Sequence, residues 1–429
     1  MKINLEQYRL STDDELRFEV GAVEVLLELT EGDAEMFGTP LIRYKKYQIP
    51  AGFRGAVYAM KSAVIEIAGP LESAYTAHAA VPMVPYRNVH AGLRTKRIRT
   101  APYQTGPKVL IAGPKDVGKS TLCKLLGNYA VRTGNQVLYV DLDPGQNIVF
   151  PGCLSVINVE KLSHPLYGFD TDKPYALNFG SLNPLKNQKL YDIMVEHISE
   201  VVNKKLKAID KFRKGGVIID TTAYSKGVYY KSILRAAEIF NVDLLIVLDH
   251  ERLYADLQKD LKGKPTKIIH LPKSGGVESR TPAQEAESRR NVIQKYFYGT
   301  KAQPFYPRSF EFVYDKPKEE WDLKVARIGV DALPSSCLPY GMAPDEHQTM
   351  VEQVNFTPAL NHKIVALTED TGSLTSAIIK KNVRGFALIQ EVDTPNKVVQ
   401  VLLAEEPPIK YNLGILSEVE FMDDMPGRM

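Results

Sequence analysis

Residues 113–120 read Gly-Pro-Lys-Asp-Val-Gly-Lys-Ser and fit the pattern G-x-x-x-x-G-K-[ST] at every fixed position. The apolar run Lys108–Ala112 precedes this stretch, and Ser120–Arg132 follows it with helical spacing. In such a unit the glycines let backbone N–H groups surround phosphate oxygens, and the helix start adds positive potential. A chance turn before an ordinary helix is much the weaker alternative, because the flanking strand and helix are both present. The stretch therefore predicts a nucleoside-triphosphate site.

This loop also predicts individual contacts. We expect Lys119 to reach the β- and γ-phosphates and the Ser120 hydroxyl to ligate Mg²⁺. The nucleotide contacts expected from the loop are Asp116, Val117, Gly118, Lys119, Ser120 and Thr121. A GTPase would carry an N-K-x-D motif, and the nearest match, Asn396–Val399, lacks the aspartate. Because that motif is missing, adenine is the expected base. A deviant phosphate loop would have a further lysine where this chain has Pro114, so we expect the ordinary form of the loop.

Strand and helix signals alternate after residue 107. Further strands are expected at Gln136–Val140, Gly216–Ile219, Val242–Leu248 and Lys267–Leu271. Helical stretches separate these runs, which favours a parallel sheet covered by helices. The predicted fold class is α/β, with a central P-loop NTPase domain flanked by β-rich domains.

Short strands and turns dominate both ends of the chain. Before about residue 85 we expect no helix, turns at Gly32-Asp33 and Lys61-Ser62, and strands at Glu15–Val20, Glu24–Leu29, Ala34–Phe37, Ala56–Met60 and Ala63–Ile67. Toward the C-terminus, strands are expected at Lys363–Leu367, Gly385–Ile389 and Lys397–Leu403. We therefore predict an N-terminal all-β domain (1–90), a P-loop ATP-binding domain (91–305) and a small C-terminal β-rich domain (306–429).

Composition narrows the class of protein. The 429 residues carry 54 Lys+Arg and 51 Asp+Glu, with 44% hydrophobic and 24% charged residues. These values exclude a largely disordered chain or a histone-like arm. No apolar run approaches the ~18 residues of a membrane span, and no secretory signal is visible. The three cysteines, Cys123, Cys153 and Cys337, are too few for a disulfide framework or a four-thiolate zinc site, so we expect an intracellular protein without a structural metal.

Carboxylates follow two of the predicted central strands. Asp141 and Asp143 are two residues apart, so their side chains share one face of the extended chain. At the C-terminal end of a parallel strand they would lie beside the phosphate loop. One could order the Mg²⁺ water shell and the other accept a proton from an attacking hydroxyl. Asp220 follows the next strand in the manner of a Walker B aspartate, although solvated or capping carboxylates remain an alternative for all three.

A basic connector, residues 91–107, joins the first two predicted domains. Its residues 94–99 read Arg-Thr-Lys-Arg-Ile-Arg. They could contact RNA phosphates or serve nuclear import. A solvated linker is the favoured interpretation, because charge runs usually face water.

Distinctive motifs extend over nearly the whole chain. They are Glu15–Val20, Ala34–Thr39, Gly113–Cys123, Leu142-Asp143, Leu248–Tyr254, Leu271–Val277, Tyr296–Gly299 and Ser336–Met342. With these motifs the chain resembles the Clp/Grc family of polynucleotide 5′-hydroxyl kinases, and most closely its branch in the nuclear mRNA cleavage and polyadenylation machinery.

The resemblance implies a β domain that folds over bound ATP, with Glu15 as an acidic contact and Arg54 where a basic contact is expected. It implies Mg²⁺ held by Ser120 and, through water, Asp143. It also implies a nuclear subunit of the pre-mRNA 3′-end cleavage and polyadenylation factor. The implied partners are other cleavage factor subunits, including one with an RNA-polymerase tail-interaction domain. RNA is a candidate partner, and no membrane partner is expected.

Two functions stay open under this resemblance. Active members transfer the ATP γ-phosphate to the 5′-OH of RNA, and the catalytic residues would then be Lys119, Asp143 as general base and Arg280 from a lid. This chain has Tyr224 where active members have a clamping tryptophan, and a tyrosine ring there could still clamp the substrate by stacking on a base. It has Glu285 at a lid position that active members fill with arginine. A carboxylate there opposes the charge stabilisation that arginine provides. We therefore expect a subunit that holds ATP structurally, with an active kinase as the alternative and a hydrolase with switch loops as a weaker third.

Overall fold

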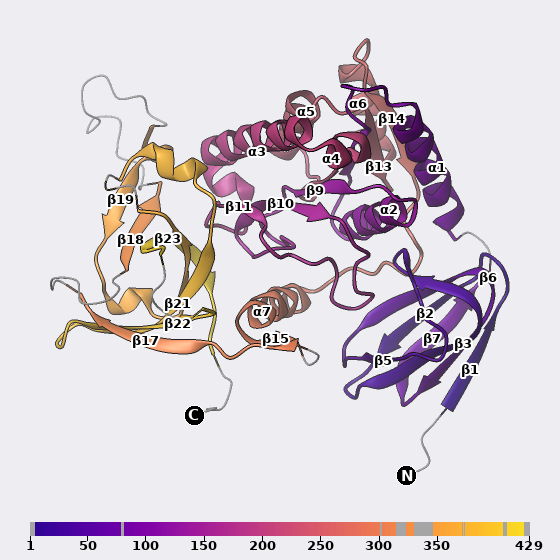
Figure 1. The fold of residues 1–429 in the computed structure, drawn as a ribbon, viewed down its shortest axis with the longest axis horizontal. Coiled ribbons are helices and arrows are strands. Elements are labelled where there is room, and N and C mark those ends of the chain that lie inside the picture. The colour runs from indigo at the N-terminus through magenta and orange to yellow at the C-terminus, as the bar shows by residue number, and fades with distance from the viewer. Residues whose placement is uncertain are drawn as a thin grey trace. The chain divides into compact units, whose positions relative to one another are not determined.

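The computed structural model describes residues 5–78, 81–300, 303–314, 323–329, 346–370, 372, 374–405 and 410–423. The motif at 336–342, including Cys337, lies outside the described residues. The chain forms two compact units. Figure 1 shows the helices and strands that make them up. The first comprises Met1–Val140, Asn158–Asp172 and Asn203–Ser279, and the second comprises Asp141–Ile157, Lys173–Val202 and Arg280–Met429.

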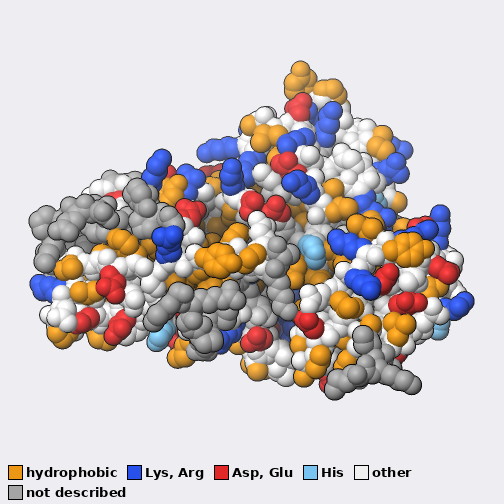
Figure 2. All heavy atoms as spheres, turned by 60° about the horizontal axis from the view of Figure 1, so that its bottom comes forward, with side chains coloured by type: hydrophobic (Ala, Val, Ile, Leu, Met, Phe, Trp, Pro, Cys, Tyr) orange, Lys and Arg blue, Asp and Glu red, His pale blue; other side chains and the backbone are white. Residues whose placement is uncertain are grey.

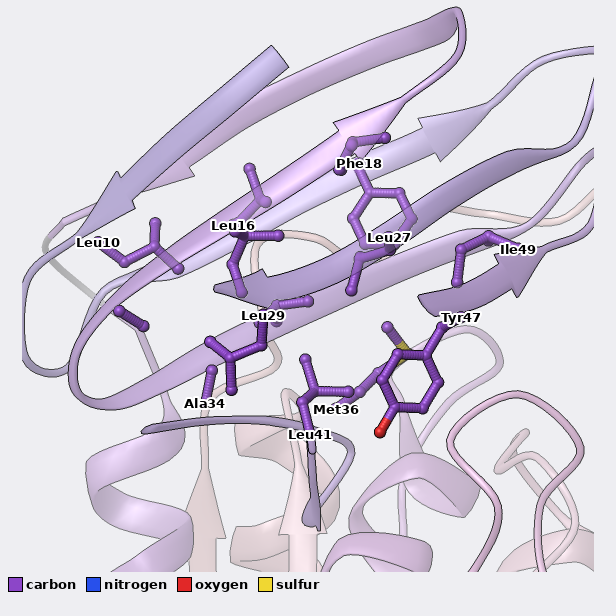
Figure 3. Close-up of a cluster of buried hydrophobic side chains, with 14 of the residues drawn as sticks. Leu10, Leu16, Phe18, Leu27, Leu29, Ala34, Met36, Leu41, Tyr47 and Ile49 are labelled. Carbon is purple, nitrogen blue, oxygen red and sulfur yellow. The ribbon is translucent and has the colours of Figure 1, made fainter. Parts of the chain in front are cut away.

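The first unit begins with antiparallel β-structure. Its strands run in the order β4-β3-β6-β2-β7, with β1 paired to β6 and β5 paired to β3. The bounds are β1 (Leu5–Leu10), β2 (Glu15–Val20), β3 (Val25–Met36), β4 (Thr39–Pro40), β5 (Lys46–Ile49), β6 (Arg54–Ala68) and β7 (Leu71–Ala77). Figure 3 shows Leu16, Leu27 and Met36 among the apolar side chains that fill the space between these strands. The all-β prediction for this part of the chain is confirmed.

Two predicted turns in this β-structure are wrong. β6 runs unbroken through Lys61-Ser62, because one long strand pairs with β1, β2 and β3. β3 runs through Gly32 with shifts of register in place of a reversal. Gly32 has φ +81°, and a Cβ there would lie 1.8 Å from Ser62 O. The glycine therefore marks a bulge where two strands approach closely, a position that larger residues cannot occupy.

Helix α1 (Met83–Arg99) follows the β-structure and begins before residue 85, where no helix was expected. Most of the basic run is exposed, as expected for a solvated linker, but one of its residues packs into the first unit. Arg97 is buried and donates to a backbone carbonyl, and Lys96 Nζ lies 2.5 Å from Asp243 Oδ1. The other two arginines of the run are exposed.

The remainder of the first unit is built on parallel strands. They run in the order β9-β12-β8-β13-β14, and the β12/β8, β8/β13 and β13/β14 pairs are parallel. The strands are β8 (Lys108–Ala112), β9 (Val137–Asp141), β12 (Val217–Asp220), β13 (Leu244–Leu248) and β14 (Lys267–Leu271). The helices are α2 (Lys119–Arg132), α4 (Asp210–Gly215), α5 (Val228–Ile239) and α6 (Glu251–Asp260), while α3 (Gln188–Ala208) has residues in both units. The predicted parallel strands and the helix after the loop are confirmed, and the loop leaves β8 at the edge where such sheets bind ligands.

The second unit combines a hairpin, a helix and a β-sheet. The antiparallel hairpin of β10 (Cys153–Val159) and β11 (Tyr175–Asn178) was not expected from the sequence. The helix is α7 (Pro282–Tyr298), and β15 (Gly299–Thr300) pairs with β16 (Gln303–Pro304). The sheet order is β17-β22-β21-β20-β23-β18-β19. Its strands are β17 (Arg308–Val313), β18 (Lys324–Ile328), β19 (Val351–Val354), β20 (Lys363–Thr368), β21 (Gly385–Asp393), β22 (Val398–Leu403) and β23 (Leu413–Glu420), which confirms the three predicted strands.

The core of the second unit joins its parts. Phe150 stacks on Phe386 with the ring centroids 3.8 Å apart, and Tyr296 of α7 meets both rings edge-on. The same cluster includes Cys153 of the hairpin. Residues from three segments distant in sequence therefore form one hydrophobic core.

The surface matches the balanced charge of the sequence. Basic and acidic side chains are interspersed over the face shown in Figure 2. Among the described residues no helix combines the length and apolar character that crossing a membrane requires.

Candidate nucleotide site

The phosphate loop, residues 113–118, has the backbone that an anion requires. Gly113 packs against β13, and a Cβ on it would lie 2.8 Å from Leu248 O, so a larger residue would displace the loop. Gly118 caps α2 with φ +86° and supplies no side-chain acceptor. The first N–H groups of α2 therefore keep their donor capacity, and the positive end of the helix dipole adds to it.

Lys119 is the buried cation of this loop. Its Nζ donates to Pro114 O at 2.7 Å, and only 8% of the residue is exposed. The bond keeps the ammonium group within the loop. A phosphate oxygen would be a stronger partner than a carbonyl, because both groups would then be charged.

Asp220, at the end of β12, is buried beneath the start of α2. Its Oδ2 accepts a hydrogen bond from Tyr139 at 3.1 Å, whereas Oδ1 is buried without a hydrogen-bond partner among the described residues. Burial raises the pKa of Asp220, and the Ser120 hydroxyl and then the Lys119 charge oppose this shift. An unpaired carboxylate oxygen beside a serine hydroxyl is a donor set that fits hydrated Mg²⁺. The residues present therefore fit the predicted metal.

The segment after β14, residues 272–278, contacts the phosphate loop. A Cβ on Gly118 would lie 3.4 Å from Val277 Cγ2, so Val277 covers the start of α2. At the other end of the segment, Pro272 O accepts a 2.7 Å hydrogen bond from Tyr86 of α1. The segment is thus fixed at one end by α1 and lies over the loop at the other.

The β-structure reaches the same segment through Arg17 of β2. Arg17 Nη2 donates to Ser274 Oγ at 3.3 Å. A Cβ on Gly276 would lie 2.8 Å from Arg17 Cδ, so the glycine lets the arginine pack flat against the backbone. Arg17 Nε also donates to Glu15 Oε2 at 2.8 Å. A continuous set of contacts therefore runs from Glu15 through Arg17 and residues 274–277 to Gly118.

Glu15 and Arg54, the two contacts implied by the resemblance, have different environments. Glu15 is 5% exposed and pairs with Arg17, so it is not the solvated charge that its position in a β domain would suggest by default. Arg54 is more exposed, pairs with Glu19 at 2.6 Å and lies 3.2 Å from Glu278. The Glu19 carboxylate raises the pKa of Arg54. Arg54 thus lies against residues 272–278 directly, through Glu278, whereas Glu15 reaches this segment through Arg17. Sequence reasoning missed Arg17, whose only signal was its place in the Glu15–Val20 motif.

Tyr224 lies beside the first residue of the loop. Its backbone N–H donates to Gly113 O at 2.8 Å. Its ring meets His250 edge-on at 5.1 Å and Tyr230 at 6.5 Å, and the residue is half-buried. The ring has packing partners, and base stacking by Tyr224 stays a prediction.

Asp141 and Asp143 belong to the second unit and differ in environment. Asp141 is buried and accepts hydrogen bonds from the N–H groups of Asp143, at 3.0 Å, and Ile148, at 2.8 Å. It therefore holds the loop after β9 in shape. Asp143 accepts from Gly145 N at 2.9 Å and is less buried. The general-base and metal roles of Asp143 stay predictions.

The predicted lid residues Arg280 and Glu285 also belong to the second unit. Thr281 and Gln284 form a capping box at the start of α7, and Glu285 lies in the first turn. Negative charge is favourable there because of the helix dipole. Glu285 thus has a structural reason to be acidic. The catalytic role of Arg280 stays a prediction.

Family models match three stretches of this chain. The N-terminal beta-sandwich domain of polyadenylation factor matches residues 9–100. The P-loop of mRNA cleavage and polyadenylation factor CLP1 matches residues 113–299. The model described as pre-mRNA cleavage complex II protein Clp1 matches residues 317–423.

Full-length relatives and solved structures agree with these matches. The chain is 43% identical to Protein CLP1 homolog of Brugia malayi, over 98% of this chain and 97% of that protein. It is 38% identical to Protein clpf-1 of Caenorhabditis briggsae, over 98% of both. A structure of the extended interface between Pcf11p and Clp1p, which also gives the basis for ATP loss in a point mutant, aligns with TM-score 0.85 and 22% identity over 98% of this chain and 99% of that one. The wild-type Clp1p–Pcf11p complex aligns with TM-score 0.84 and 21% identity over 98% of both. At these identities the structures support the fold.

Proposed function

Because the chain belongs to the Clp1 family of mRNA cleavage and polyadenylation factors, we propose that it is the ATP-binding subunit of a nuclear pre-mRNA 3′-end cleavage and polyadenylation factor. ATP serves as a structural ligand in this proposal. The observation that carries it is the set of contacts from Glu15 through Arg17 and residues 274–277 to Gly118. A nucleotide held by the loop would rest against residues that the β-structure positions.

The chain supplies most of the binding chemistry from its own residues. The amides at the start of α2 and the ammonium group of Lys119 hold the phosphates, while Glu15 and Arg54 contact the adenine side. Ser120 and Asp220 would hold Mg²⁺, with Asp143 acting through water, and the ion would neutralise phosphate charge. Bound ATP stabilises the folded first unit by RT ln(1 + [L]/Kd), about 2.7 kcal/mol at a hundredfold excess over Kd. Occupancy alone can therefore have a structural effect.

The alternative function is a polynucleotide 5′-hydroxyl kinase. In that case Asp143 accepts the proton of the RNA 5′-OH, and Lys119 and Arg280 stabilise charge on the transferring phosphoryl group. The complete phosphate loop favours this alternative. The acidic residue Glu285 and the packed ring of Tyr224 disfavour it.

One experiment separates the two functions. We would purify the protein, measure bound nucleotide, and then incubate it with γ-labelled ATP and a 5′-OH RNA. The structural proposal expects ATP to copurify intact and no label to reach the RNA. Lys119→Ala should lose the ATP, whereas Lys115→Ala, an exposed position of the same loop, should keep it. Labelled RNA that depends on Lys119 and Asp143 would establish the kinase, and wild-type protein that binds no ATP would overturn both.

The remaining assignments are proposals of the same kind. We assign residues 1–90 to the nucleotide cover, 91–305 to ATP binding and 306–429 to a C-terminal domain. The partner would be a cleavage factor subunit with an RNA-polymerase tail-interaction domain, which the solved Clp1p–Pcf11p complexes support by analogy. Coprecipitation with that subunit and nuclear fluorescence of the tagged chain test the partner and the location.

A further inference from the structure

We propose that the first unit carries a surface for single-stranded RNA, formed by Arg94, Ile98, Arg99, Tyr103 and Lys214. We call it the Tyr103 surface. This surface is separate from the nucleotide site, because Tyr103 lies before the start of β8 and the phosphate loop lies after the end of β8. A five-residue strand places these two ends about 13 Å apart. The proposal does not rest on phosphoryl transfer or on bound ATP.

Tyr103 is presented to solvent by a fixed turn. It is 95% exposed and has φ +74°, a backbone region that residues other than glycine rarely adopt. The turn is closed by a 3.1 Å hydrogen bond from Gln104 N to Ala101 O. Arg213 fixes it to α4, since its Nη1 donates to Gln104 O at 2.9 Å and its own carbonyl accepts from Gly106 N at 2.7 Å. The ring therefore stands in water on a support that hydrogen bonds hold in place.

Two exposed cations precede the Tyr103 turn along the chain, and a third, Lys214, lies beside the turn in the fold. Arg94, Arg99 and Lys214 are exposed, and none of them has an ion pair within the described residues. A Cβ on Gly106 would lie 2.1 Å from Lys214 O, so Lys214 lies directly beside the Tyr103 turn.

The neighbouring charges compensate one another. The pairs are Lys96–Asp243, Lys211–Glu160 and Arg213–Asp210. The Tyr103 surface thus keeps an excess of positive charge, although the whole chain is nearly neutral.

These features favour a nucleic acid over a peptide. A peptide anchor needs a buried pocket for its side chain, whereas Tyr103 and Ile98, 95% and 73% exposed, stand clear of any wall. An exposed aromatic face between cations is the arrangement that stacks an unpaired base and follows its phosphates. Duplex RNA keeps its bases stacked internally, so the surface selects single strands.

The test uses full-length protein and a fluorescent oligouridylate of about twelve nucleotides. The RNA carries a 5′-phosphate, so it cannot be a kinase substrate. We expect Tyr103→Ala to weaken binding about tenfold and Tyr103→Phe to keep it, because stacking needs only the ring. Lys214→Glu should weaken binding and lower the slope of log K against log salt by at least about 0.7 between about 50 and 200 mM.

Matched controls come from the β-structure. Tyr44 is 72% exposed with φ +62°, and Tyr44→Ala should leave RNA affinity unchanged. Lys46→Glu reverses an exposed charge on β5 and should also have no effect. Equal melting temperatures would show that all variants fold. Wild-type protein that binds no RNA at about 50 mM salt would overturn the proposal. Equal affinities of Tyr103→Ala and Tyr44→Ala would overturn it too, as would loss of a bound protein partner in Tyr103→Ala with RNA affinity intact.

Discussion

Arg17 Nη2 lies 2.7 Å from Glu15 Oε2, and both side chains are almost fully buried. The same guanidinium group reaches Ser274 and packs on Gly276. One ion pair of β2 thus holds the segment that covers the phosphate loop. Removing one partner from such a pair leaves the other charge buried and uncompensated.

We predict that Arg17→Ala lowers the free energy of unfolding by about 3–5 kcal/mol, because it leaves the Glu15 carboxylate buried without a compensating charge. Denaturant unfolding monitored in the first unit measures this. The matched control is Arg43→Ala, whose ion pair with Asp33 is about half exposed on both sides. An exposed pair is worth about 1 kcal/mol or less.

Arg17→Lys separates charge from geometry. Lysine restores a positive charge beside Glu15 but cannot reproduce the planar fork that contacts two residues at once. We expect intermediate stability and a weaker ATP-dependent thermal shift than in the wild type. If Arg17→Ala lost no more than Arg43→Ala, the structural role assigned to Arg17 would be wrong.

The candidate loop could be predicted from the sequence because its parts are local. Lys108–Ala112, the glycine loop and Lys119–Arg132 form one continuous stretch, and each has its own signal. Arg17 could not be found in this way, since Ser274, its partner, lies 257 positions later in the chain. A charged residue within a strand is normally expected to face solvent, and only tertiary contacts show that Arg17 is buried.

The errors in predicting the fold also come from contacts between residues that are distant in the sequence. Lys61-Ser62 looks like a turn by composition, yet the pairing of β6 with β3 extends the strand through it. The β10/β11 hairpin was missed because its strands, Cys153–Val159 and Tyr175–Asn178, are joined by a long connection and lack a short turn signal. Local patterns specify local structure, whereas pairing between distant segments decides strand length and hairpins.

Asp220→Asn is predicted to stabilise the nucleotide-free protein. Burial raises the pKa of Asp220, so its contribution to stability is present below the unfolded pKa and is lost as the pH rises through the folded one. Above the unfolded pKa the buried carboxyl group therefore lowers stability, and at pH 7 the amide should gain about 1 kcal/mol in unfolding free energy. With Mg²⁺ and ATP bound, the wild type should be more stable than Asp220→Asn, because the amide cannot balance the charge of the ion. Thermal shifts with and without Mg²⁺ measure both effects, with the exposed Asp210→Asn as control. A nucleotide-free variant less stable than the wild type at pH 7 would contradict the assignment.

His90 is predicted to make the first unit sensitive to acid. Burial lowers its pKa to about 4, and the charge of Arg97 and two further arginines adds to the shift. A histidine with a depressed pKa stabilises the fold above its unfolded pKa of about 6.5, and this stability is lost as the pH falls toward the folded value. His90→Asn should therefore lose less stability than the wild type between pH 7 and about pH 5 in denaturant unfolding. His362→Asn, at an exposed position where asparagine tolerates the positive φ, should keep the wild-type loss. Identical pH dependence in all three proteins would rule out His90 as the cause.

Asn128, on the helix that begins at Lys119, is predicted to hold the β-structure on the phosphate-loop helix. It is fully buried, and its amide donates to Phe37 O at 2.9 Å and Ser163 Oγ at 2.8 Å while its carbonyl accepts from Ser163 N at 2.9 Å. Asn128→Ala removes these partners from Phe37 O and Ser163 N, whereas Ser163 Oγ keeps Thr39 Oγ1 at 3.1 Å. The change should cost about 3 kcal/mol of unfolding free energy. Asn135→Ala, whose amide donates only locally to Thr133, should cost about 1 kcal/mol or less.

The loop itself is untouched by the Asn128 change. The thermal shift that ATP produces should therefore persist in Asn128→Ala, starting from a lower melting temperature, whereas Lys119→Ala should abolish the shift and leave the starting point near that of the wild type. Calorimetry of both variants with and without ATP makes the comparison. If Asn128→Ala lost the thermal shift while its melting temperature stayed unchanged, Asn128 would act on the nucleotide directly. The assignment of Asn128 to the β-structure and of Lys119 to the phosphates would then be wrong.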